Sequence, residues 1–317
     1  MTGAEIVRQL RSRLQSWSER PLPLPGHGQT SLRHAQLWAA GAEDLSYARI
    51  AEAHWDAVSI LAEAGRQPET DKIYGVWASE IPGDALRLDK SNDGVTISGT
   101  KMFCSGAGLV DHALVTVGVP EKLLVDVDLR PRSASVRYDC SAWATQAFCG
   151  TNTGSAIFDA CPIHKDDVIG EAGWYLSRPG FWHGACGPAA CWAGGAESLV
   201  LYAMNNRRHD AHTMAHFGAM QADVWAMRSC LDTAGREIDA DHENCAEAHV
   251  RALTVRHIVE QHCTDVLRRF ARAYGPFPLA MDATISRRYH ELDLYLRQSH
   301  AERDLEELGK LSIRKSC

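Results

Sequence analysis

Histidine and carboxylate side chains that can move protons occur together near the end of the chain. His300 and Asp304 are one helical turn apart, a spacing at which a carboxylate can fix the imidazole tautomer and raise its basicity. Glu302 is the competing base. Residues two apart on a helix point about 200° away from each other, so only one of His300 and Glu302 can face a given pocket. The stretch HAERDLEELGK also fits a solvated charged helix face.

Thiol and imidazole groups that could bind a metal ion also occur in the sequence, but their spacing is a weak indication of a metal site. His183, Cys186 and Cys191 are the nearest approach to a zinc arrangement, but the stretch is rich in Ala and Gly and offers no second ligand pair. Small cysteines that pack a helix interface explain it better. A second polar cluster contains His209, Asp210, His212 and His216. It is typical of a helix junction, and we therefore expect no metal.

The spacing of apolar residues predicts the helices and strands that position these groups. Apolar residues from Ala51 to Ala62 recur at three and four residues, which predicts an amphipathic helix that stops at Gly65, after an extended lead-in at 21–30. From residue 71 the period changes to two, most clearly in KLLVDVDL, and also in GVTISGTKMF, HALVTVGV and GSAIFDA. Turn residues at 92–94 and 150–154 separate these runs, so we expect a sheet or barrel of about 100 residues.

Helical spacing returns after Gly173. Predicted helices cover 189–205, the stretch VRHIVEQHCTDVLRRFARAY that ends at Gly275, and 287–308. Because strands and helices do not alternate, a doubly wound sheet is excluded, and no Rossmann or P-loop glycine signature is present. The order predicts a helical region at 1–70, a β domain at 71–173 and a helical bundle at 174–317.

Composition sets the broad class. A chain of 317 residues with 45% apolar residues can bury a large core, and its net charge of -7 lacks the long charge runs expected for nucleic acid or membrane surfaces. The first twenty residues are too polar for a signal peptide, and no apolar run could span a bilayer. We therefore expect a cytoplasmic protein whose ten cysteines are reduced.

Three segments in order resemble the acyl-CoA dehydrogenase family. They are YGVWASE with Pro82, Gly83 and Asp84, then SGTKMFCSGA continued by DHALV, and then GSAIFD with Pro162 and VIG before Arg178. Together they cover most of residues 71–310. The resemblance, to a short bacterial-type variant, implies an α+β fold with a truncated N-terminal helical domain, a middle β-barrel domain and a C-terminal helical bundle, and FAD as cofactor.

The resemblance also assigns cofactor contacts. Ser105 would meet the flavin N5 and O4 edge, Phe103 would pack against the ring, and Trp77, Ala78 and Ser79 would line the pyrimidine side. Both aromatic residues also fit as ordinary strand core. The adenine half of FAD is gripped in that family by an Arg-x-x-Phe-Gly segment of a neighbouring subunit. Here the match is Met214 to Gly218, with His216 and Phe217 but no arginine there.

Catalytic groups are harder to assign by resemblance. The family uses a glutamate base on its C-terminal bundle, whereas its flavin monooxygenase branch has a histidine near the position of His300, so His300 and Glu302 both remain candidates. Arg178 and His183 would lie where the bundle begins, in a substrate-facing or a structural role.

Three functions follow from the resemblance. The first is FAD-dependent α,β-dehydrogenation of an acyl thioester such as an acyl-CoA, or of a related small molecule, with an unspecified electron acceptor. The second is a flavin-dependent monooxygenase or oxidase. The third is a non-catalytic subunit that keeps the fold. In each case the resemblance implies a homo-oligomer, with a hetero-oligomer as the alternative, and the short N-terminal region leaves the substrate open.

Overall fold

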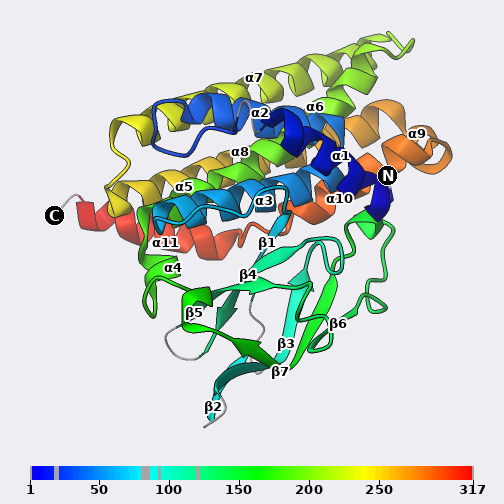
Figure 1. Cartoon of the computed structure of the whole chain (residues 1–317). Coiled ribbons are helices and arrows are strands. Elements are labelled where there is room, and N and C mark those ends of the chain that lie inside the picture. Colours follow the sequence, from blue (N-terminus) through cyan, green and yellow to red (C-terminus); the bar gives the residue numbers. More distant parts are fainter. Residues whose placement is uncertain (1, 18–20, 80–85, 92–93, 119–121, 316–317) are drawn as a thin grey trace. The chain divides into compact units, whose positions relative to one another are not determined.

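The computed structural model of the protein describes residues 2–17, 21–79, 86–91, 94–118 and 122–315 (Figure 1). Its packing divides the chain into two compact units. The first contains Met1–Pro21 and Arg49–Phe181, and the second contains Leu22–Ala48 and Trp182–Cys317. The first 70 residues therefore contribute to both units, and the three-domain division stays a prediction.

The first unit contains all of the described strands, arranged in two four-stranded sheets. One sheet has the order β1-β4-β5-β8, built from Tyr74–Trp77, His112–Val117, Leu123–Asp128 and Val168–Ile169. The other has the order β2-β3-β7-β6, built from Arg87–Ser91, Gly94–Cys104, Gly154–Ile163 and Val136–Asp139. Strand β1 runs parallel to β4, and the other pairs are antiparallel.

Helices and short turns complete this unit. They are α1 (Gly3–Trp17), α3 (Leu45–Glu63, in this unit from Arg49 onward), η1 (Cys149–Thr151), η2 (Lys165–Asp167), α4 (Trp174–Ser177) and the start of α5 (Pro179–Gly184). The apolar face of α3 packs through Ile60 and Leu61 against Tyr74 and Leu114 of the first sheet, and Tyr175 joins the same core. The predicted helix is confirmed, but the predicted stripe matches the buried face only in part, because Ala51 and Trp55 are buried whereas Val58 and Ala62 are partly exposed.

The second unit is helical among its described residues. It contains α2 (Thr30–Glu43), α6 (Cys186–Met204), α7 (Ala211–Ala240), α8 (Cys245–Tyr274), α9 (Pro276–Met281), α10 (Ala283–Leu296) and α11 (Glu302–Lys315). Asp210, Asn244 and Asp282 cap α7, α8 and α10 by accepting backbone N–H groups of the first turn.

Two glycines let α2 and α6 approach closely. A Cβ atom on Gly194 would lie 2.0 Å from the Trp38 carbonyl oxygen, and one on Gly41 would lie 2.3 Å from the Cys191 carbonyl oxygen. The contact is reciprocal, because each glycine faces the backbone of the other helix. Any side chain at either position requires the helices to move apart.

Most predicted elements occur at the predicted places. The strands predicted in KLLVDVDL, GVTISGTKMF, HALVTVGV and GSAIFDA correspond to β5, β3, β4 and β7, and the helix predicted at 189–205 corresponds to α6. The helix predicted at 287–308 is wrong in extent, because residues 297–301 interrupt it between α10 and α11. Ala301 has φ +48°, a conformation that ends a helix. Asn92, Asp93 and the stretch from Glu80 to Asp84 lie outside the described residues.

Asp111 joins three parts of the first unit through its buried carboxylate. It accepts bonds from Arg11, from Arg130 and from the Ile73 backbone N–H at 2.9 Å. Burial opposes the charged form, but these donors outweigh it and lower the pKa of Asp111. Its contribution to stability is therefore present above the ordinary Asp pKa and is lost as the pH falls through the lower folded-state value.

The Asp111→Asn variant is expected to lose about 2–3 kcal/mol of unfolding free energy at neutral pH, because both arginines lose a charged partner. The difference from the unmodified protein should shrink below pH ~4, where the carboxylate protonates in the unfolded chain. Urea unfolding at pH 7 and pH 3.5 measures it. Asp159→Asn, at an exposed carboxylate of the same unit, is the control. A loss independent of pH would exclude a role of the charge.

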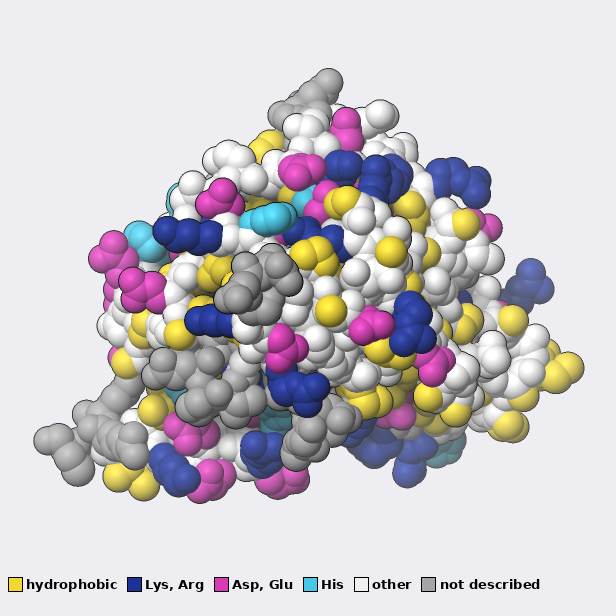
Figure 2. Space-filling view, turned by 60° about the horizontal axis from the view of Figure 1, so that its bottom comes forward, with side chains coloured by type: hydrophobic (Ala, Val, Ile, Leu, Met, Phe, Trp, Pro, Cys, Tyr) yellow, Lys and Arg dark blue, Asp and Glu magenta, His cyan; other side chains and the backbone are white. Residues whose placement is uncertain are grey.

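Charged side chains of both signs are interspersed over the face of the molecule in Figure 2. Within the described ranges, no helix combines the length and the apolar character needed to cross a bilayer.

Candidate functional site

The structure brings together the two stretches expected to hold a flavin. Trp77, at the end of β1, donates its indole N–H to the backbone carbonyl of Ser105 at 3.0 Å, and Ser105 directly follows β3. Ala78 and Ser79 continue from the end of β1, with Ala78 partly buried and Ser79 exposed. The end of one sheet is thereby tied to the end of the other within the first unit.

The Ser105 hydroxyl lies in a short polar network. It accepts the Arg49 Nε–H at 3.1 Å and lies 3.0 Å from the Thr153 hydroxyl, which in turn lies 2.7 Å from the Thr151 hydroxyl. The Thr151 hydroxyl donates to the Phe148 carbonyl at 2.8 Å. These hydrogen bonds fix the orientation of the Ser105 hydroxyl. A polar group that positions a ligand needs such a fixed orientation.

Phe103 combines two features that cost free energy. Its backbone has φ +57°, in the left-handed region that a bulky residue rarely adopts, at a register shift between β3 and β7. Its side chain is 52% exposed, so the ring is not ordinary core. Such strain is found at ligand sites more often than elsewhere. Trp77, in contrast, is buried. Its burial is compatible both with an ordinary core residue and with a residue that contacts a cofactor.

Arg178 is engaged in structural contacts of the first unit. Its buried guanidinium donates to Glu63 Oε2 at 2.5 Å and lies 5.7 Å and 5.4 Å from the ring centroids of Trp174 and Tyr175. Glu63 also accepts the Gly180 N–H. These contacts agree with the structural alternative for Arg178, whereas its catalytic role stays a prediction.

His183 and the neighbouring cysteines lie in the second unit. His183 is buried, and its Nε2 donates to the His242 carbonyl at 2.8 Å. Cys186 and Cys191 are buried on α6, and all nine cysteines of the described residues are free thiols. Burial raises the pKa of the Cys186 thiol to about 12.

His216 and Phe217 lie on the first turns of α7, half-buried. Burial lowers the pKa of His216, and the nearby Arg272 and Arg269 of α8 lower it further. The imidazole Nδ1 has no hydrogen-bond partner within the described ranges. The segment from Met214 to Gly218 lacks the arginine expected from the resemblance, but α8 carries the positive charges of Arg269 and Arg272 near His216.

His300 makes the predicted contact with Asp304, since its Nδ1 lies 3.3 Å from Asp304 Oδ1. The expected helical relation to Glu302 is wrong, because His300 precedes α11 and Glu302 begins it. The His300 side chain is 66% exposed, and Glu302 is also exposed. The bonds to Asp304 hold His300 at the helix start, as an Asp within the first turn favours.

Helix α8 separates these two candidate groups. The charges of Arg268, Arg269 and Arg272 lower the pKa of His216, so His216 lies near the end of α8 that carries them. His249 lies near the other end of α8, where Asp304, the partner of His300, raises its pKa against the effect of burial. About twenty residues at about 1.5 Å each put the two ends roughly 30 Å apart. His216 and His300 of one protomer therefore do not share a small pocket.

Three residues of the Ser105 network did not emerge from the sequence. They are Arg49, Thr151 and Thr153. Arg49 interrupts an otherwise apolar run, YARIA, and that interruption is the one signal that could have drawn attention to it. The threonines lie in a turn whose only signal was its glycines.

Comparison with known proteins places the fold. Neither a family model nor a curated protein sequence matches the chain. Solved structures match it along most of its length, and they show that it has the α+β acyl-CoA dehydrogenase-like fold expected from the sequence.

Three of these structures illustrate the likeness. TdsC of Paenibacillus sp. A11-2 in complex with FMN and indole has a TM-score of 0.77 at 14% identity, and the match covers 99% of this chain and 97% of TdsC. KijD3 in complex with FMN and a dTDP-linked amino keto sugar has a TM-score of 0.78 at 15% identity, covering 89% and 79%. A nitrososynthase of Micromonospora carbonacea var. africana has a TM-score of 0.77 at 14% identity, covering 98% and 94%.

Proposed function

We propose that this protein is a flavin-dependent oxidoreductase that oxygenates a small molecule. The observation that carries the proposal is the arrangement of Trp77, Phe103 and Ser105 at the ends of β1 and β3. An exposed aromatic residue two positions before a serine whose hydroxyl is oriented could serve an isoalloxazine, which has a broad apolar face and a polar N5 and O4 edge. A bound flavin supplies the redox and O₂ chemistry, while these side chains bind and orient it.

Two observations favour oxygenation over dehydrogenation of an acyl-CoA. The first is that His300, the histidine candidate for the base, contacts Asp304, a carboxylate that can fix its tautomer. Structures of similar fold also include TdsC, described as a dibenzothiophene monooxygenase, and a methanesulfinate monooxygenase of Pseudomonas fluorescens. Dehydrogenation of an acyl thioester is the second candidate, favoured by the family resemblance of the β segment.

FMN fits this chain better than the FAD implied by the resemblance. In that family an arginine binds the adenosine half of FAD. The corresponding segment of this chain has no arginine and contains His216. FMN ends in a single phosphate and needs no adenine contact. The solved structures of TdsC and KijD3 cited above contain FMN.

Absorbance between about 350 and 500 nm tests the cofactor, because the conjugated ring of a flavin absorbs there. We expect the protein mixed with FMN and then desalted to retain yellow colour. With reduced FMN and a substrate, O₂ consumption supports oxygenation, whereas dye reduction by an acyl-CoA under anaerobic conditions supports the second candidate. A protein that stays colourless with both FMN and FAD is the non-catalytic subunit.

The Trp77→Phe variant is expected to bind flavin about 10-fold more weakly. The change keeps an aromatic ring but removes the N–H that holds the Ser105 carbonyl, a loss of about 1–1.5 kcal/mol. Fluorescence titration with FMN measures it. Trp143→Phe is the matched control, since its indole N–H also donates to a backbone carbonyl, that of Ala147 at 2.8 Å. Equal weakening in both variants would argue against the site.

A homo-oligomer remains part of the proposal. Large apolar side chains are exposed on the second unit, among them Trp225 at 72%, Phe277 at 69% and Met281 at 73%. Exposed apolar groups of this size are typical of association surfaces. Light scattering of the purified protein is expected to give at least twice the mass of one chain, and a monomer would contradict this expectation.

A further inference from the structure

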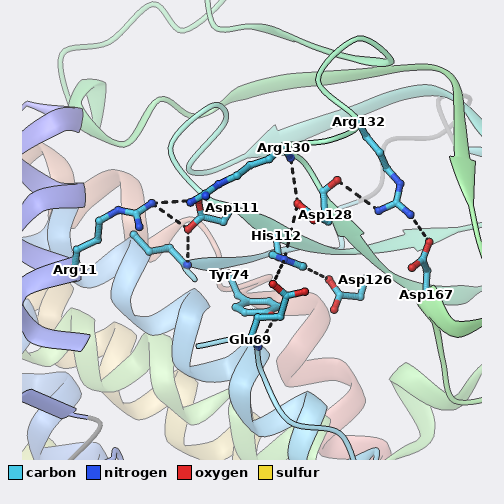
Figure 3. A network of polar contacts seen from close by, with 11 residues as sticks. Arg11, Glu69, Tyr74, Asp111, His112, Asp126, Asp128, Arg130, Arg132 and Asp167 are labelled. Atoms are coloured by element: carbon cyan, nitrogen blue, oxygen red, sulfur yellow. Dashed lines mark hydrogen bonds and ion pairs between the residues drawn. The ribbon is translucent and has the colours of Figure 1, made fainter. Parts of the chain in front are cut away.

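A hollow in the first unit, whose lining does not include Trp77 or Ser105, has acidic side chains at half of its ten lining residues. Its volume is about 530 Å³, and its lining includes five carboxylates, from Glu69, Asp126, Asp128, Asp166 and Asp167. His112 lies at its wall with 4% of its surface exposed. Figure 3 shows Glu69, from the segment before β1, and Asp126 and Asp128, both from β5, around this imidazole.

The sheet sets the positions of these groups. His112 of β4 lies directly opposite Asp128 of β5 in the antiparallel register, and Asp126 lies two residues away on the same face. Glu69 precedes β1, and its backbone N–H donates to the Tyr74 hydroxyl at 2.9 Å. The Tyr74 ring stacks on His112 with 4.7 Å between centroids, which fixes the imidazole plane.

The two ring nitrogens of His112 have different surroundings. Nδ1 lies 2.9 Å from Asp126 Oδ1, so it carries the proton and donates it there. Nε2 is buried and has no hydrogen-bond partner among the residues that the structure describes. It faces Glu69 Oε2 at 3.6 Å and Asp128 Oδ1 at 3.9 Å, distances too long for hydrogen bonds. Two carboxylates on either side of this nitrogen attract a cation, which is a proton on Nε2 in the empty site and can be replaced by a metal ion.

The nearest arginines are directed elsewhere. The Arg130 guanidinium donates to Asp111, and Arg132 donates to Asp167 at 2.5 Å and to the Asp128 backbone carbonyl at 3.4 Å. The Asp128 carboxylate accepts the Arg130 backbone N–H at 3.2 Å, which leaves lone pairs available. Neither guanidinium has a described bond to the Glu69 or Asp128 carboxylate.

The ligand atoms are spaced for one ion. One atom each from Glu69, His112 and Asp128 lie within 4.8 Å of one another. In a tetrahedral Zn²⁺ site, with bonds of about 2.0–2.2 Å, ligand atoms lie about 3.3–3.6 Å apart, so small side-chain movements complete the geometry. The contact from His112 Nδ1 to Asp126 is the carboxylate partner that metal-binding histidines usually have.

We propose that His112 Nε2 and the carboxylates of Glu69 and Asp128 bind a divalent transition-metal ion of the zinc class, with water completing the coordination. Asp126 is a positioning residue that holds the imidazole. One imidazole and two carboxylates favour Zn²⁺ over Mg²⁺ or Ca²⁺, which prefer oxygen ligands alone. The ion links the segment before β1, through Glu69, to β4 and β5, through His112 and Asp128. This site is independent of the proposed flavin chemistry.

Calorimetric titration of chelator-treated full-length protein with Zn²⁺ tests the site, with Co²⁺ as a spectroscopic probe. We expect one ion per chain, and a Co²⁺ spectrum without the thiolate charge-transfer band that cysteine binding would give. Zn²⁺ should raise the melting temperature by roughly 2–4 °C or more, while Mg²⁺ should not. Glu69→Gln and Asp128→Asn change partly exposed groups, so both variants should fold.

The variants separate a built site from general attraction. Glu69→Gln and Asp128→Asn should each weaken Zn²⁺ binding by more than 10-fold, and Asp126→Asn by about 10–100-fold. Asp166→Asn removes an equal charge from the same hollow at an exposed position and should change binding less than 3-fold. Equal weakening by all four variants, a thiolate band with Co²⁺, or no binding above background would each overturn the proposal.

Discussion

Phe103→Gly is expected to change stability and flavin binding in opposite directions. Glycine adopts a positive φ without the steric cost that a phenylalanine pays at φ +57°, and the exposed ring contributes little burial. The unfolding free energy should therefore rise or stay within about 1 kcal/mol. Flavin affinity should fall by at least about 10-fold, because the aromatic wall of the proposed site is lost.

Urea unfolding of the flavin-free protein and fluorescence titration with FMN measure the two effects separately. Phe103→Tyr is the control, since it keeps both the aromatic ring and the backbone strain and should bind FMN nearly as the unmodified protein does. Loss of stability together with retained affinity would mean that Phe103 supports the fold and contributes nothing to a cofactor site.

Gly194→Ala is expected to cause the largest loss of stability among the changes considered. The added methyl group would lie 2.0 Å from the Trp38 carbonyl oxygen, and a backbone atom cannot move aside as a flexible side chain can. Separating α2 from α6 disturbs a buried interface, so we expect a loss of about 3 kcal/mol or more. The urea midpoint of the second unit, followed by circular dichroism at 222 nm, measures it.

Gly309→Ala is the matched control for this change. Gly309 also lies within a helix, α11, but a Cβ atom there meets nothing within 4 Å. Alanine has the higher helix propensity, so this variant should gain up to about 1 kcal/mol. If Gly194→Ala behaves like Gly309→Ala, the close approach of α2 and α6 does not exist in solution.

Local periodicity was sufficient to predict the main elements. The alternation in KLLVDVDL predicted β5, and the apolar stripe before Gly275 predicted α8, because each pattern is set by residues close in sequence. The break at residues 297–301 was missed because polar residues such as Gln298 and His300 fit a helix surface as well as a turn. The close packing of α2 on α6 was missed because no helix was predicted at Thr30–Glu43, and contacts between segments so far apart leave no local pattern.

Prediction of the candidate site was limited by distance along the chain. The motif resemblance selected Trp77, Phe103 and Ser105, and the structure joins Trp77 to Ser105, whereas the contact of all three with flavin stays a prediction. The Arg49 contact joins residues 56 positions apart, and no local pattern reports such a pairing. The acidic hollow was missed for the same reason, since Glu69, His112 and Asp128 lie on three separate segments. Sequence-based expectations of a metal considered only neighbouring cysteines and histidines.

The segment with His216 and Phe217, at the start of α7, has a consequence for symmetry. If this segment contacts the cofactor of a neighbouring protomer, as the resemblance implies, each site needs a second chain. In a two-fold dimer each protomer then gives this segment and receives the same segment in return, so every cofactor is held by two chains. A mixed dimer of one chain altered at Phe103 and one altered at His216 would have one damaged and one undamaged site. Loss of the dimer on dilution would release flavin from both sites together.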